Sequence, residues 1–258
     1  MNKRPSRNYL DLILYKAYAD LKAEAARGYL GTLWWVLEPV LYLGVFYIVF
    51  SVIRYRDESD FISFMLIGLV VWKWFASTVA QGAKSVSGGA ALMQQVYLPK
   101  YIFPVVVAVT NLVKFGVVFA LLLAYLVFYG VGPHGSWGVL PLLVLLQFVM
   151  SLAVAGILSA MLPFLPDMQK LIENALGLLF FLSGVIFNVN QVPEDFRPYL
   201  YLNPMVTLIE NYRAVIIGGE TPAWGALGFV FLFSMVGLVI AIWLLDRFDR
   251  VYPKVLVR

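Results

Sequence analysis

The sequence predicts an all-α polytopic membrane protein: six transmembrane helices, an N-terminal amphipathic interface helix, and re-entrant periplasmic gate helices. Of its 258 residues, 62% are hydrophobic and 13% are charged, and its mean hydropathy is +0.83. Soluble domains are about 45–50% apolar and about 25% charged, so this composition cannot form an ordinary water-exposed surface. Crossing a bilayer takes about 20 apolar residues. Six stretches approach that length, at about 33–53, 61–80, 104–129, 138–162, 172–187 and 224–245.

Residues 1–30 precede the transmembrane domain, 31–258, and contain an amphipathic helix over 8–30. One face of this helix carries Leu10, Leu14, Ala17, Leu21 and Ala25 at helical spacing. Such a helix can lie in the membrane interface, held by that apolar face and by attraction of its basic side chains to anionic lipid. Docking on a soluble partner is the alternative. Because the chain begins with polar residues, we expect no cleavable signal peptide.

Two segments between spans predict moving parts. In 88–100, Gly88-Gly89 breaks the chain, and a short helical stretch then ends at Pro99. Such a hinged helix on the cytoplasmic face can transmit a movement of a soluble partner to the spans. The alternative is that the segment is only a connector. In 188–222, Asn203-Pro204 begins a helix. This helix is too short to cross the bilayer, so we expect it to dip in and return as a gate.

Basic residues set the orientation. Thirteen of the 19 Lys and Arg lie on the side of the N-terminus, four lie on the opposite side, and Lys73 and Lys114 lie within spans. Positive charge gathers on the cytoplasmic side of membrane proteins, so both termini are expected in the cytoplasm. Lys114 lies about 15 Å into its span at 1.5 Å per residue. It must face protein or water, because facing lipid is costly.

The sequence predicts no catalytic or metal site. The chain has no cysteine and a single histidine, His134, which lies in a Gly/Pro-rich loop where we expect it to be solvated. These counts exclude disulfide frameworks, thiol catalysis and zinc sites. The GxxxxGK[ST] phosphate loop is absent from the sequence, so the chain has no P-loop of its own to bind ATP. Energy for uphill transport would come from another subunit.

Aromatic side chains recur along two spans at helical spacing, through the depth of the membrane rather than only at its interfaces. Aromatic faces can stack on the C–H faces of sugars without fixing their register, so these stripes suit a path for a large amphipathic substrate. Packing between helices or against lipid is the alternative for each residue. The candidate path residues are Trp35, Tyr42, Phe46, Phe50, Phe61, Phe64, Trp72 and Phe75, with Lys114 beside them.

Three segments resemble the permease subunits of polysaccharide ABC exporters, and above all Wzm-type O-antigen permeases, with capsule and teichoic-acid permeases as relatives. They are ADLKAEAARGYLGTLWWVLEPV (19–40), QQVYLPKYIFPV (94–105) and LNPMVTLIENYRAVIIGGETP (202–222). The resemblance runs in order over nearly the whole chain. It implies a homodimer in the bacterial inner membrane, with two ATPase subunits that bind ATP and Mg, so this chain needs no cofactor. The implied substrate is a polysaccharide linked to undecaprenyl pyrophosphate, and nucleic acid is not expected as a partner.

The resemblance also suggests roles for single residues. The ATPase contacts are expected at Met93, Gln94, Tyr97, Leu98 and Pro99. The periplasmic gate is expected at Asn203, Pro204, Tyr212 and Arg213. Our hypothesis for the pyrophosphate head group is attraction to Lys22, Arg27 and Lys100, because cationic donors suit a diphosphate. A drug permease of the same architecture, or a channel or secondary transporter that works without an ATPase, are the alternatives; Lys114 is the only feature that favours the latter.

Overall fold

The computed structural model describes residues 7–26 and 58–255, together with short stretches between 31 and 48. The described residues form helices and no strands. The longer helices are α1 (Arg7–Ala26), α3 (Glu58–Gly88), α5 (Ile102–Phe128), α6 (Leu140–Met161), α7 (Met168–Leu182), α9 (Pro204–Ile216) and α10 (Trp224–Arg247). The short ones are α4 (Ala90–Gln95), η1 (Gly135–Val139), η2 (Val189–Gln191), α8 (Arg197–Leu200) and α11 (Tyr252–Val255).

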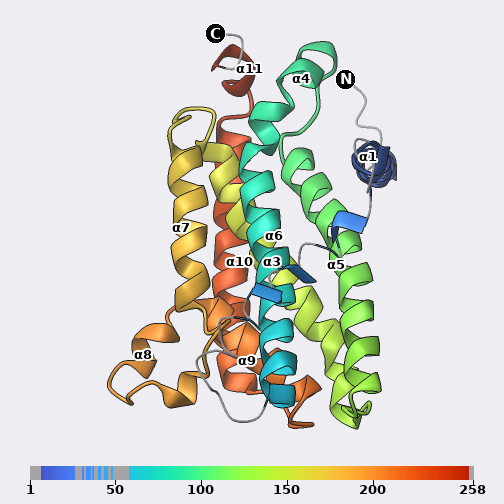
Figure 1. The fold of residues 1–258 in the computed structure, drawn as a ribbon. Coiled ribbons are helices and arrows are strands. Elements are labelled where there is room, and N and C mark those ends of the chain that lie inside the picture. Colours follow the sequence, from blue (N-terminus) through green and yellow to red (C-terminus); the bar gives the residue numbers. More distant parts are fainter. Residues whose placement is uncertain are drawn as a thin grey trace.

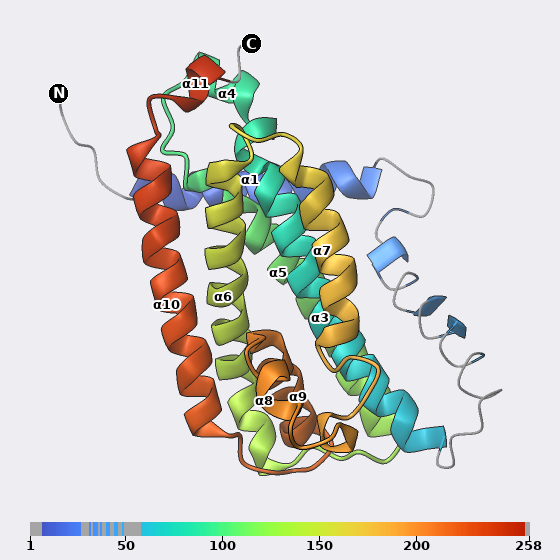
Figure 2. The same ribbon diagram turned by 90° about the vertical axis from the view of Figure 1, so that its left-hand side faces the viewer.

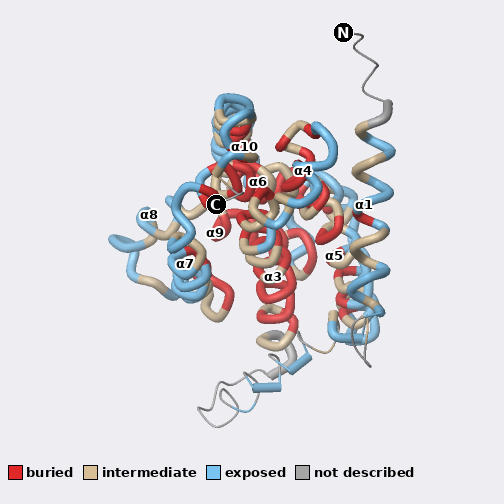
Figure 3. Tube along the Cα trace, turned by 90° about the horizontal axis from the view of Figure 1, so that it is seen from above, coloured by how far each residue is buried: buried red, intermediate tan, exposed pale blue. Residues whose placement is uncertain are grey.

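Helices α3, α5, α6, α7 and α10 run along the long axis of the molecule (Figures 1 and 2). Helix α6 packs against α3, α5 and α10, whereas α7 packs against α3. The short helices α4 and α11 lie at one end, called here the α4 end, and α1 lies across the bundle near it. Helices α8 and α9 lie at the opposite end, called here the α9 end. Seen along the axis, α3 is largely buried, whereas α1, α7 and α10 are exposed on their outer sides (Figure 3).

Four described helical segments are long and apolar enough to cross a membrane by length and composition: Phe61–Gln95, Ile102–Phe128, Gly135–Met161 and Trp224–Arg247. They confirm four of the six predicted stretches as apolar helices. Helix α3 continues to Gly88 rather than ending near 80, because no proline interrupts it and its earlier glycines stand singly, unlike the Gly88-Gly89 pair. Most of the first predicted span, 33–53, lies outside the described residues.

The fifth predicted span, 172–187, has different bounds. Helix α7 begins earlier, at Met168, and ends at Leu182. Gly184 follows with a φ of 67°, a left-handed conformation that favours glycine and stops the helix. At 15 residues, α7 is shorter than the about 20 residues needed to cross the hydrocarbon core.

Small residues let the central helices approach closely. A Cβ added to Gly82 of α3 would lie 2.6 Å from the Ala155 side chain of α6. A Cβ added to Gly156 of α6 would lie 2.8 Å from the Ala241 side chain of α10. Membrane helices use such small residues at their contacts because backbone approach increases van der Waals packing. The α3–α6–α10 contacts therefore form the rigid centre of the described bundle.

Helix α9 begins as predicted and packs inside the bundle. The Asn203 side chain accepts a hydrogen bond from the Met205 N–H at 3.0 Å, and Pro204 takes the first helical position. Ten of its 13 residues are buried. The Arg213 side chain, 6% exposed, donates to the carbonyls of Phe64 (3.0 Å), Gly184 (2.6 Å) and Val185 (2.7 Å). One guanidinium therefore joins α9, α3 and the turn after α7.

We expect Gly68→Ala to disrupt this junction, because the new Cβ would lie 2.5 Å from Arg213 Nη2 and 3.2 Å from the Val185 carbonyl oxygen. Displacing the guanidinium leaves buried carbonyls unpaired, at a cost of about 1–3 kcal/mol. Thermal unfolding in detergent measures this loss. Gly116→Ala is the matched control, since a Cβ there meets nothing within 4 Å. Equal thermal midpoints for Gly68→Ala and Gly116→Ala would show that the Arg213 junction does not stabilise the fold.

Candidate functional site

The segment predicted to contact an ATPase lies at the α4 end. Of the five predicted residues, Gln94 and Tyr97 are exposed and Pro99 is half-buried. Met93 and Leu98 are buried within the chain, and their predicted contact with an ATPase stays a prediction. Met93 packs in a cluster with Phe103 and Tyr252, and Leu98 packs with Ala17 of α1. A six-residue helix buries one face, and sequence spacing alone did not show which.

Two further apolar side chains in this segment are exposed, and the sequence did not predict them as ATPase contacts. Leu92 is 37% exposed and Val96 is 56% exposed. Helix α4 also ends at Gln95 rather than continuing to Pro99, and Val96 has extended backbone angles. The outward surface of residues 92–97 is therefore part helix and part extended chain.

Asp249, which the sequence did not single out, holds this segment in place. Its Oδ1 lies 3.3 Å from Lys100 Nζ, and its Oδ2 accepts a hydrogen bond of 2.8 Å from the Tyr97 hydroxyl. Lys100 also donates to the Leu98 carbonyl at 3.0 Å and is 3% exposed. The Lys100 ammonium is therefore buried against Asp249, and its predicted attraction of a head group stays a prediction. The hydrogen bond to the Asp249 carboxylate raises the pKa of Tyr97, which keeps the phenol protonated.

The turn after α10 ties this cluster to the bundle. Tyr252 of α11 is fully buried, and its hydroxyl donates to the Ala160 carbonyl of α6 at 3.2 Å. Its ring packs with Met93 of α4 and Leu245 of α10. Residues 249–252 therefore connect the α4 segment to both α6 and α10.

A second polar cluster links the N-terminal helix to α5. The Glu24 carboxylate of α1 forms an ion pair with Lys114 Nζ and accepts a 3.1 Å hydrogen bond from Trp35 Nε1. Lys114 Nζ also lies 5.7 Å from the centre of the Trp35 ring. A cavity of about 130 Å³ adjoins the cluster and is lined partly by Lys73 and Asn111. Lys114 thus has a protein partner, as the cost of facing lipid requires.

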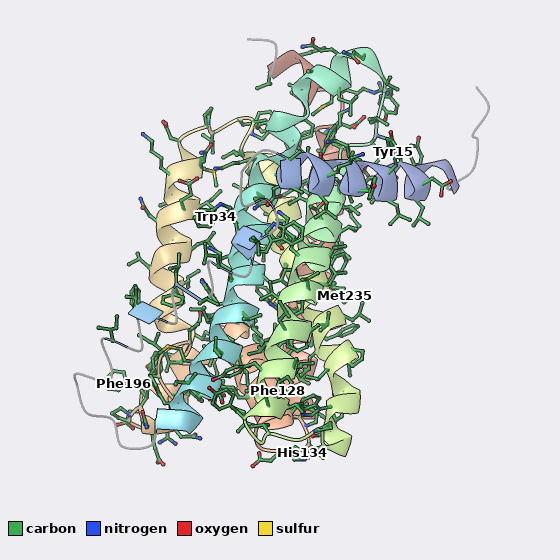
Figure 4. All side chains as sticks on the ribbon, turned by 45° about the vertical axis from the view of Figure 1, so that its right-hand side comes forward. Tyr15, Trp34, Phe128, His134, Phe196 and Met235 are labelled. Carbon is green, nitrogen blue, oxygen red and sulfur yellow. The ribbon has the colours of Figure 1, made fainter. Side chains whose placement is uncertain are left out.

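The apolar face predicted for α1 has a buried part and an exposed part. Ala17 is buried against α5, together with the half-buried Ile13. Leu10 and Leu14 are 61% and 53% exposed, and Lys22 is also exposed. Figure 4 shows α1 lying across the bundle with Tyr15 near one end of the molecule, while His134 and Phe196 lie at the other. A helix that packs against protein on one face and exposes apolar side chains on the neighbouring face is suited to lie at a membrane surface.

The predicted path residues that the structure describes are packed. Trp72 contacts Phe75 and Phe180, with ring centres 5.4 and 6.2 Å apart, and both Trp72 and Phe75 are buried. Phe64 lies 3.3 Å beneath the Arg213 guanidinium, and Phe61 is half-buried. Trp72 also borders a groove of about 480 Å³ between α3 and α7. Arg27, Tyr42, Phe46 and Phe50 lie outside the described residues, so their roles stay predictions.

The predicted gate residues lie at the α9 end. Asn203 caps α9 and donates to the Ser183 hydroxyl at 2.8 Å, and Pro204 follows it. Tyr212 is fully buried, with its ring 5.9 Å from that of Phe119. Tyr212 and Arg213 thus hold α9 in the bundle and do not lie on its outer surface. Within the described part of the chain, no group of three or more His, Cys, Asp or Glu could hold a metal ion.

We predict that Glu24 and Lys114 stabilise α1 as a pair. Lys114→Met and Glu24→Gln should each lower the thermal midpoint, and the double variant should be no less stable than either single one, with a coupling of about 1 kcal/mol. Thermal unfolding of the four proteins measures the coupling. Lys22→Met, at an exposed position on the same helix, is the control. Additive losses would show that the two side chains act independently.

We predict that Asp249→Asn loosens the α4 segment, because it leaves the buried Lys100 charge without its ion-pair partner. Hydrogen exchange of residues 96–101 should accelerate about tenfold or more, which corresponds to about 1.4 kcal/mol. Asp246→Asn, an exposed position on α10, should leave the exchange unchanged. Parent-like exchange in Asp249→Asn would exclude this role for Asp249.

Residues 19–217 match the family model described as ABC-2 type transporter. The chain is 32% identical over 216 residues to the O-antigen export system permease protein RfbA of Myxococcus xanthus, covering 83% of each chain. A permease of the same name from Klebsiella pneumoniae is 25% identical over 81% of each chain. The polysialic acid transport protein KpsM of Escherichia coli is 25% identical over 86% of this chain and 88% of its own. This chain belongs to the ABC-2 type transporter family.

Proposed function

We propose that the chain is the transmembrane permease subunit of an ATP-driven exporter that moves a lipid-linked polysaccharide, and specifically an O antigen, across the bacterial inner membrane. The observation that carries this proposal is the similarity to an O-antigen export permease over 83% of both chains. The similarity to a polysialic acid transport protein makes a capsule polysaccharide the second candidate. Both polysaccharides are long polymers with many hydroxyl groups.

Six membrane crossings fit the course of the described helices. Helix α1 lies near the α4 end, whereas α3 begins at the α9 end (Figures 1 and 2). The chain between them has to connect the two ends, which supports a first crossing over 33–53. Helix α7 and the buried α9 together account for a fifth crossing with a re-entrant part. This topology puts both termini on one side, and the distribution of basic residues favours the cytoplasm.

Energy would enter at the α4 end. The exposed side chains of Leu92, Gln94, Val96 and Tyr97 form a mixed apolar and polar surface suited to a soluble ATPase. Two such subunits would bind ATP and Mg and close against a homodimer of this chain, which needs no catalytic group of its own. Movement of the α4 segment would reach α10 through Asp249 and reach α6 through Tyr252, because those contacts bridge the elements.

The substrate would enter beside α1. Its pyrophosphate group would be attracted by Lys22 and Arg27 at the cytoplasmic interface. The glycan would then pass between the two subunits along the first span, with Tyr42, Phe46 and the Trp72 groove as its lining. The apolar outer side of α7, with Leu171, Leu178 and Phe181 exposed by 64%, 68% and 56%, is available for the second copy or for lipid.

Deleting the gene tests this function. We expect the polysaccharide to disappear from the cell surface and to accumulate at the cytoplasmic face, and the parent gene to restore it. Complementation with Val96→Glu should restore neither export nor co-purification of the ATPase, because a charge there opposes an apolar contact. Val96→Leu keeps an apolar side chain at this exposed position and is the matched control, and equal membrane levels of the two variants would exclude general misfolding. Normal surface polysaccharide in the deletion strain would overturn the proposal.

A further inference from the structure

A cavity at the α9 end is lined by several polar side chains from four separate segments of the chain. Its volume is about 370 Å³, within the usual range of about 300–1,000 Å³ for small-molecule sites. The lining includes Phe64 of α3, Tyr201 after α8, Glu210 of α9 and the flanking residues Asn188, Asn190 and Glu220. Two amides, two carboxylates and a phenol therefore meet beside one aromatic ring. The proposed O antigen would leave the protein at this end.

The chemistry of the lining does not suit an anion. Arg213 also borders the cavity, but its Nε, Nη1 and Nη2 donate to main-chain carbonyls. The two carboxylates give the lining an excess of negative charge, which repels phosphate. Hydroxyl groups, by contrast, can donate to carboxylates and can exchange hydrogen bonds with amides in both directions. The lining thus matches a neutral ligand with many hydroxyls.

Several lining groups are fixed before any ligand arrives. The Asn188 side chain accepts from the Asn190 N–H at 3.0 Å, and Arg197 donates to the Asn190 carbonyl at 2.8 Å. The Tyr201 hydroxyl donates to Glu210 at 2.6 Å. Burial and this carboxylate raise the pKa of Tyr201 to about 12, so its proton stays in place at neutral pH. A prearranged set of groups loses less entropy when it binds.

We infer that this cavity is a saccharide-binding site that holds one or two sugar residues of the polymer as it leaves the protein. The inference rests on the proposed function and adds a specific contact to it. Asn188, Asn190 and Glu220 at the exit end would bind hydroxyl-rich sugar units, so this end would do more than open for the polymer. Recognition here is separate from attraction of the pyrophosphate, which the acidic lining disfavours.

A thiol-protection experiment tests the site, because the parent chain has no cysteine. Asn190→Cys and, as the matched control on the same exposed loop, Asp195→Cys are labelled in cells with a membrane-impermeant maleimide. We expect the labelling of position 190 to be about tenfold slower in cells that make the polymer than in cells that do not, whereas position 195 is unaffected. Equal rates at position 190, with export intact, would overturn the site but not the proposed function. Failure of both thiols to react would contradict the outward orientation and thereby the proposed function.

A second variant separates binding from simple obstruction. Glu220→Gln keeps the shape of the side chain but removes a charged acceptor, and hydrogen bonds to charged groups are the stronger ones. In the Asn190→Cys background it should abolish most of the tenfold protection, whereas Asp195→Asn, at an exposed position outside the cavity lining, should not. Unchanged protection in Glu220→Gln would overturn recognition by this carboxylate. If a chelator, without polymer, alters the labelling of position 190 but not that of position 195, the cavity holds a cation, and the saccharide site is wrong.

Discussion

Buried main-chain carbonyls at the α9 end constrain the rest of this structure. Helix α7 ends at Leu182 and a buried turn follows, so the Gly184 and Val185 carbonyls lack the partners that a continuing helix would supply. Irregular backbone at membrane depth is tolerated only where the protein itself satisfies it. Arg213 does so with two donors and uses a third on Phe64. A glycine at position 68 leaves room for the guanidinium, which lets α9 fold back into the bundle.

The same requirement explains the two ion pairs at the opposite end. Lys114 and Lys100 are both shielded, and each meets an acid that lies far away in sequence, Glu24 and Asp249. A charge shielded from water is costly unless it is paired. Each pair therefore fixes a peripheral element: the first holds α1 to α5, and the second holds the α4 segment to the end of α10. Both pairs thus attach an element at the periphery of the described chain to the helices of the bundle.

Local signals in the sequence predicted the elements well, but not their partners. Apolar length identified four of the described helices, Gly88-Gly89 the end of α3, and Asn203-Pro204 the start of α9. These signals act within a few residues. Asp249 and Tyr252 were missed because their meaning depends on Tyr97, Lys100 and Ala160, which only folding brings near. The burial of Met93 and Leu98 was not predicted for the same reason. Opposite charges that change together at two distant positions among related sequences would be the signal for such pairs.

The two ends of the molecule differ in chemistry in a way that suits a substrate with two unlike parts. Basic residues outnumber acids near the N-terminus and the α4 end, where an anionic head group would be attracted. At the α9 end, Glu210 and Glu220 face the cavity, and the nearby Arg213 is occupied by carbonyls. A diphosphate is therefore favoured at the first end and disfavoured at the second, whereas sugar hydroxyls find partners at the second. Such a gradient would leave the glycan at the exit while the head group is still held near its point of entry.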